Sequence, residues 1–78
     1  MTARENLRKN IRWLREANHM TQQRVADLVE MKRCNYAAVE EGRSSLGPDQ
    51  LVKFSKLYVV SIDELLSDTI LKAPVFKI

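Results

Sequence analysis

Residues that could carry catalytic or metal-binding chemistry are scarce in this chain of 78 residues. The sequence holds one histidine, His19, and one cysteine, Cys34, too few for a zinc site built from Cys and His ligands. Neither has an evident nucleophile or base as partner, and no glycine-rich loop could cradle a phosphate. The sequence therefore predicts no enzyme activity, no metal and no cofactor.

Basic side chains could instead bind an anionic partner. The chain has 13 Lys and Arg against 10 Asp and Glu, a net charge of +3. The whole excess lies in residues 1–43, which hold nine basic and six acidic residues, whereas residues 44–78 hold four of each. A charge of this size fits a solvated surface as well as a nucleic-acid-binding face. The choice between the two therefore depends on the secondary-structure elements that position the charges.

Length and composition limit the architecture. A chain this short forms one domain and buries only about 60% of its unfolded surface, which argues against a deep substrate cleft. Apolar residues make up 45% of the chain, enough for a core, and no apolar run approaches the ~18 residues that cross a membrane. The charged N-terminus lacks the apolar block of a secretory signal, so we expect a cytoplasmic protein. From the short length we also expect no effector-binding or self-cleaving domain.

Capping residues and apolar spacing predict an all-α domain of five helices within residues 1–67. The expected helices cover about residues 3–18, 22–29, 33–41, 48–58 and 62–66. Their starts are marked by Thr2, Thr21, Pro48 and Ser61, and Gly42 ends the third. The expected core residues are Leu7, Ile11, Leu14, Val25, Ala26, Val29, Tyr36, Val39, Leu51, Phe54, Tyr58, Leu65 and Leu66, with Trp13 as a half-buried cover.

Residues 68–78 form the expected C-terminal tail. Residues 73–78 alternate apolar and other side chains, which favours one short edge strand that could serve dimerisation. A disordered tail is the alternative.

The second and third helices are separated by a tight corner at residues 30–32. A helix, a short turn and a second helix form the helix-turn-helix arrangement, whose second helix enters the DNA major groove. Six stretches carry a family resemblance: Leu14-Arg15, Thr21-Gln22, Val25-Ala26, Val39-Glu40, Gly42-Arg43 and residues 60–66. On these, residues 5–67 resemble the Cro/phage-repressor (Xre-type) helix-turn-helix proteins. The resemblance implies a lambda-repressor-like fold and a sequence-specific regulator of transcription, with repression the expected mode.

The resemblance also assigns roles to individual residues. It implies an ion pair between Arg15 and Glu40 that fixes the angle of the recognition helix. The implied base-reading residues are Lys32, Arg33, Cys34, Asn35 and Ala38. Arg33 is the best suited, because Arg donates twice to guanine, while the small Cys34 and Ala38 suit a thymine methyl. The implied phosphate contacts are Arg12, Thr21, Gln22, Arg43 and Ser44, with Arg8 and Lys9 as weaker candidates.

Three turns depart from the family pattern. The family commonly has glycine where this chain has His19, Glu30 and Val59. Either these turns adopt left-handed backbone, which costs about 1–2 kcal/mol for a residue with a Cβ and most for a branched one, or their local geometry differs from that of the family.

The partner implied by the resemblance is a palindromic operator in double-stranded DNA, bound by a homodimer with half-sites about 34 Å apart. The expected dimer contact involves the fifth helix, the loop before the fourth and the tail, with Leu46, Leu57, Val59, Val75, Phe76 and Ile78. The alternative is a protein-interaction module, such as an antitoxin, that binds a toxin or another regulator through Leu28, Leu57 and the tail. A phage regulator, a restriction-modification controller and an antitoxin are all compatible with the sequence.

Overall fold

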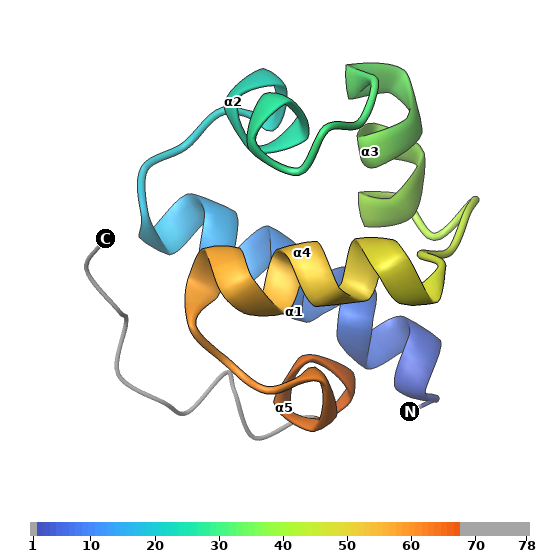
Figure 1. The fold of residues 1–78 in the computed structure, drawn as a ribbon. Coiled ribbons are helices and arrows are strands. Elements are labelled where there is room, and N and C mark those ends of the chain that lie inside the picture. Colours follow the sequence, from blue (N-terminus) through green and yellow to red (C-terminus); the bar gives the residue numbers. More distant parts are fainter. Residues whose placement is uncertain (1, 68–78) are drawn as a thin grey trace.

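Five α-helices account for most of residues 2–67, the part of the chain that the computed structural model describes (Figure 1). They are α1 (Ala3–Ala17), α2 (Gln22–Leu28), α3 (Arg33–Glu40), α4 (Pro48–Tyr58) and α5 (Ile62–Leu66). The all-α prediction is confirmed. The first three helices each end one residue earlier than expected, because Asn18, Val29 and Glu41 are already their C-terminal caps. The predicted tail and strand lie outside the described residues.

Side-chain caps set where the helices begin. The Thr21 hydroxyl accepts the Arg24 N–H of α2 at 3.1 Å. Ser61 accepts the Glu64 N–H of α5 at 3.1 Å, and Glu64 accepts the Ser61 N–H at 3.4 Å, which completes a reciprocal capping box. At the start of α1, Thr2 accepts the Glu5 N–H at 3.2 Å, but the Glu5 carboxylate binds the Thr2 hydroxyl instead of its N–H. The first capping box is therefore only half formed.

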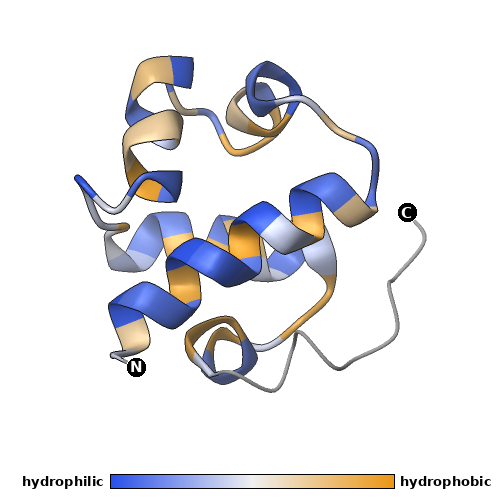
Figure 2. Cartoon of the chain, turned by 180° about the vertical axis from the view of Figure 1, so that it is seen from behind, coloured by the Kyte–Doolittle hydropathy of each residue, from blue (hydrophilic) through white to orange (hydrophobic). Residues whose placement is uncertain are grey.

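The helices are arranged around α1 and α4, which cross the middle of the domain, with α2 and α3 to one side and α5 to the other (Figure 1). Figure 2 shows from behind that the outward face of α1 is largely hydrophilic. Tyr36 of α3 stacks on Phe54 of α4 with ring centroids 5.9 Å apart, and Tyr58 follows 6.4 Å from Phe54. The buried apolar residues are Leu7, Ile11, Leu14, Val25, Ala26, Val29, Tyr36, Val39, Phe54, Tyr58, Val60 and Leu65.

Two residues predicted for the core lie at its rim. Leu51 and Leu66 are only half-buried, because each packs against the buried cluster from outside. Trp13 is half-buried against the same cluster, as predicted.

Four helices end on a residue with left-handed backbone, and these are His19, Glu30, Val59 and Gly42, with φ of 57°, 60°, 55° and 82°. The next N–H closes each end onto a carbonyl of the last turn: Met20 on Arg15 at 3.0 Å, Met31 on Ala26 at 2.8 Å, Arg43 on Ala38 at 2.9 Å and Val60 on Ser55 at 3.1 Å. Of the two alternatives at the three non-glycine positions, the structure has left-handed backbone at all three. Strain is greatest at the branched Val59.

Replacing Glu30 with Gly should raise Tm by about 4 °C, roughly 0.5–1 kcal/mol, because glycine relieves left-handed strain. The substitution removes only one exposed ion pair, from Lys53 Nζ to Glu30 Oε1 at 3.5 Å. Thermal unfolding followed by circular dichroism measures the change. The matched control is Lys56→Gly at an exposed position of α4, where glycine should cost about 1 kcal/mol. An unchanged or lowered Tm for Glu30→Gly would contradict strain at this turn.

Two asparagines of α1 hold the end of α5. Asn10 is fully buried, and its Nδ2 donates to the carbonyl oxygens of Leu65 at 2.8 Å and Ser67 at 2.6 Å. Asn6 Nδ2 donates to the Leu66 carbonyl at 3.2 Å. Carbonyl groups in the last turn of a helix have no partner within the helix, so α1 supplies the C-terminal cap of α5.

Candidate nucleic-acid interface

The first turn of α3 presents its side chains to solvent. Lys32, Arg33, Cys34 and Asn35 are exposed, and Ala38, one turn later, is partly exposed. The opposite face of the helix is buried through Tyr36, Val39 and Glu40. No side chain caps the N-terminus of α3, so its first N–H groups lie beside the exposed turn. The five residues predicted to read bases are thus all accessible to solvent.

The face of α3 that looks inward is held by an ion pair. Arg15 of α1 donates to Glu40 from Nε to Oε2 at 2.7 Å and from Nη2 to Oε1 at 3.1 Å. The exposed fractions of the two side chains are only 15% and 4%. Gln22, the first residue of α2, donates to Oε1 of Glu40 at 3.1 Å. One carboxylate therefore joins three helices and sets how α2 and α3 lie against α1.

The electrostatics of this cluster keep Glu40 ionised. Burial acts to raise its pKa, but the hydrogen bonds from Arg15 and Gln22 outweigh it, and the pKa of Glu40 lies below its ordinary value. The hydrogen bond to Glu40 in turn raises the pKa of Arg15. Burial raises the pKa of Tyr36 and of Tyr58, so both phenols are neutral at neutral pH. The charges beneath α3 are consequently one cation, Arg15, and one anion, Glu40, which pair with each other.

Four of the predicted phosphate contacts lie at two helix ends that meet, whereas Arg12 lies within α1. Thr21 and Gln22 begin α2, and Arg43 and Ser44 follow the end of α3. The bond from Gln22 to Glu40 holds the first of these ends against the last turn of α3. The exposed Arg43 and Ser44 continue from that turn. The structure thus groups both pairs around the C-terminal end of α3.

Two of the predicted phosphate contacts have acidic neighbours. Arg43 Nη2 lies 2.6 Å from Glu41 Oε2, and both side chains are more than half exposed. Arg12 Nε lies 3.7 Å from Glu16 Oε1 one turn further along α1. Exposed pairs of this kind are weak, so a stronger anion can replace the carboxylate.

Arg4 belongs to the same region, although no role was predicted for it. Its Nη2 donates to the Gly42 carbonyl at 3.5 Å, across the turn that leads to Arg43. The sequence could have indicated that Arg4 belongs with the other basic residues of α1. Arg4, Arg8 and Arg12 recur at intervals of four and so share one face of that helix.

Comparison with known proteins gives one match. A family model described as Helix-turn-helix matches residues 11–65 and includes α2, the corner and α3 in full. No curated protein and no solved structure matches the chain significantly. Within residues 2–67, no three His, Cys, Asp or Glu side chains are grouped so that they could hold a metal ion, and no helix is long and apolar enough to span a membrane. The chain belongs to the helix-turn-helix family of Cro/C1-type DNA-binding transcription regulators.

Proposed function

We propose that this protein is a sequence-specific regulator, acting as a repressor, that lays α3 in the major groove of double-stranded DNA. The observation that carries the proposal is the cluster of Arg15, Glu40 and Gln22, which fixes α3 by its buried face. The exposed turn at residues 32–35 then projects as one rigid unit. Rigid presentation of a few side chains is what direct reading of base edges requires.

Within this proposal, Arg33 reads guanine and Arg43 binds the backbone. A guanidinium donates to both O6 and N7 of guanine, whereas a contact to phosphate carries no sequence information. Lys32, Cys34, Asn35 and Ala38 complete the base-reading face. Arg12, Thr21, Gln22 and Ser44 are the remaining backbone contacts.

We further propose that the protein binds a palindromic operator as a homodimer, because one recognition helix covers few base pairs. Support comes from Val59, an apolar side chain that is 73% exposed at a strained turn beside α5. Leu46 and Leu57 are half-buried at the surface of the same core, and the other expected contacts, Val75, Phe76 and Ile78, lie outside the described residues. A monomer at tens of micromolar in sedimentation equilibrium, with and without operator, would contradict the dimer.

Selection of bound sequences from a random duplex pool tests the DNA proposal. Arg33→Ala should relax the preference at one or two positions, at a cost of about 1–3 kcal/mol on the preferred sequence. Arg43→Ala should weaken all sequences about equally and make the affinity less dependent on salt. Equal effects of both substitutions on every sequence would contradict the base-reading role of Arg33.

The alternative function is a protein-interaction module, and one observation favours it. Leu28 and Val52 are each 41% exposed, so apolar contact area is available at the surface. A gel shift with unselected duplex separates the two. Binding that weakens steeply with salt supports the regulator, and no binding at low salt supports the interaction module.

A further inference from the structure

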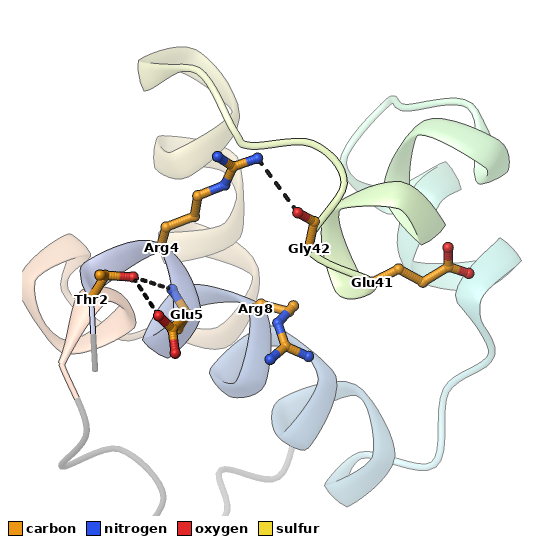
Figure 3. Close-up of a pocket in the computed structure, with 6 residues that line it drawn as sticks. All are labelled: Thr2, Arg4, Glu5, Arg8, Glu41 and Gly42. Carbon is orange, nitrogen blue, oxygen red and sulfur yellow. Dashed lines mark hydrogen bonds between the residues drawn. The ribbon is translucent and has the colours of Figure 1, made fainter.

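A hollow lies between the start of α1 and the end of α3. It has a volume of about 430 Å³ and is lined by Thr2, Arg4, Glu5, Arg8, Glu41 and Gly42 (Figure 3). Every lining residue belongs to one of these two helix ends or to the turn after α3. The hollow is therefore wide enough for a group the size of a phosphate and borders the segment that carries Arg43 and Ser44.

The two carboxylates of the hollow are already occupied. Oε1 of Glu5 accepts the Thr2 hydroxyl at 3.2 Å. Oε2 of Glu41 lies 2.6 Å from Arg43 Nη2, on the side that leads away from the hollow. Figure 3 shows the Glu5 side chain directed towards Thr2. Glu5 keeps its negative charge, but within residues 2–67 neither acid forms an ion pair with Arg4 or Arg8.

The two arginines, in contrast, retain donors. Arg4 reaches the Gly42 carbonyl through a single long bond of 3.5 Å. Among residues 2–67, the Arg8 guanidinium has neither a hydrogen bond nor an ion pair, and no contact is drawn to it in Figure 3. A guanidinium has five N–H donors and presents them in a planar fork that matches phosphate oxygens. The hollow thus has two cations with donors to spare.

Gly42 allows Arg8 to lie where it does. A Cβ at position 42 would lie 3.1 Å from Cδ of Arg8, closer than ordinary contact, and the φ of +82° at Gly42 also disfavours a side chain. The stem of Arg8 therefore packs on the turn itself, immediately before Arg43. This packing makes the hollow continuous with the proposed phosphate contacts.

We propose that the hollow is an additional phosphate subsite, in which Arg8, assisted by Arg4, binds a backbone phosphate of duplex DNA. The inference rests on the proposed DNA-binding function. It gives Arg8, a weaker candidate from the sequence alone, a defined binding position together with Arg4, beyond the contacts around Arg43. Duplex DNA is favoured over an acidic peptide because the hollow adjoins Arg43 and Ser44 on the turn after α3.

The test compares duplex affinity of the full chain and its variants between about 50 and 200 mM salt. Arg8→Gln should weaken binding about tenfold at 0.1 M salt and lower the slope of log affinity against log salt by about 0.9, the value for one lost phosphate contact. Arg8→Lys should keep most of the slope, because the charge remains. Lys56→Gln is the matched control: it removes one exposed positive charge near the end of α4, at the opposite side of the domain from the start of α1 (Figure 1), and should leave the slope unchanged. Circular dichroism shows that each variant is folded.

Three outcomes would overturn the subsite. If the wild-type chain binds duplex and Arg8→Gln keeps its slope, the subsite is wrong while the proposed function stands. If Lys56→Gln lowers the salt slope as much as Arg8→Gln does, the change comes from the net charge of the protein and not from a local contact. The subsite is then again wrong. If Arg8→Gln binds duplex normally but loses binding to a polyglutamate peptide, the hollow takes an acidic protein instead. A wild-type chain that binds no duplex at low salt would contradict the proposed function itself.

Discussion

Replacing Arg15 with Met should lower the free energy of unfolding by about 3 kcal/mol, because Glu40 is left buried without its cation. The side chain of Glu40 is only 4% exposed, so water cannot replace the guanidinium. Methionine keeps the apolar stem of Arg15, which limits the change to the charge and its hydrogen bonds. Urea denaturation at neutral pH, with the slope compared between the two proteins, measures the loss.

The matched control is Lys53→Met, which breaks an exposed pair. Lys53 Nζ lies 3.5 Å from Glu30 Oε1, and the two side chains are 41% and 77% exposed, so its loss should cost no more than about 0.5 kcal/mol. A similar cost for both variants would contradict the view that burial gives Arg15 its effect.

The loss of unfolding free energy in Arg15→Met should also depend on pH, and it should be smaller at low pH than at neutral pH. In the wild type the folded-state pKa of Glu40 is lowered, so its stabilisation is complete above the ordinary Glu pKa of about 4.3 and is lost as pH falls through the lower folded value. Without Arg15, burial raises that pKa, so the destabilisation of the variant appears as pH rises from the ordinary Glu value of about 4.3 through the raised value. The gap in unfolding free energy between variant and wild type should therefore begin to narrow above about pH 4.3 as pH falls, and narrow further below it. A gap that stays constant down to pH 3 would exclude Glu40 as its source.

Replacing Asn10 with Asp should destabilise the domain by about 3 kcal/mol at neutral pH, although the two side chains have nearly the same shape. An ionised carboxylate has no donor for the carbonyls of Leu65 and Ser67 that Asn10 now caps. It would bring negative charge against them in a fully buried position. Thermal and urea unfolding measure the effect, which should diminish at low pH, where a protonated Asp can donate again.

Asn6→Asp provides the graded comparison for this prediction. Asn6 donates a single bond, to the Leu66 carbonyl, and is only partly buried, so its replacement should cost less than half as much. Equal costs at the two positions would contradict the claim that the doubly bonded, fully buried amide holds α5 in place.

The helices could be predicted because their limits are set locally. Thr21 and Ser61 act as caps within their own turns, and the apolar spacing of α1 is complete within fifteen residues. The Arg15–Glu40 contact was expected only from the family resemblance. Nothing else in the sequence indicates which charged residues, far apart in the chain, will pair with each other.

The burial of Asn10 could not be predicted in the same way. A polar residue among regularly spaced apolar ones indicates a break in the buried face of a helix, not a buried side chain. The carbonyl groups of Leu65 and Ser67, to which Asn10 donates, lie 55 and 57 residues further along the chain. The hollow beside Gly42 was likewise hidden, because it exists only where the start of α1 meets the end of α3. The base and phosphate contacts depend on how DNA lies on the protein, so they remain predictions.

In the proposed DNA complex, phosphate groups would replace carboxylates that already pair with two arginines. These pairs are Arg43 with Glu41 and Arg12 with Glu16. Before the duplex arrives, each guanidinium already has a counter-ion of the protein's own. A phosphate that displaces the carboxylate leaves that acid to attract a cation from solution, which offsets part of the cation release from DNA. Affinity would then decline with ionic strength less steeply than the number of backbone contacts suggests. Arg8, which has no such counter-ion in the part of the chain that the structure describes, would contribute its full share of that salt dependence.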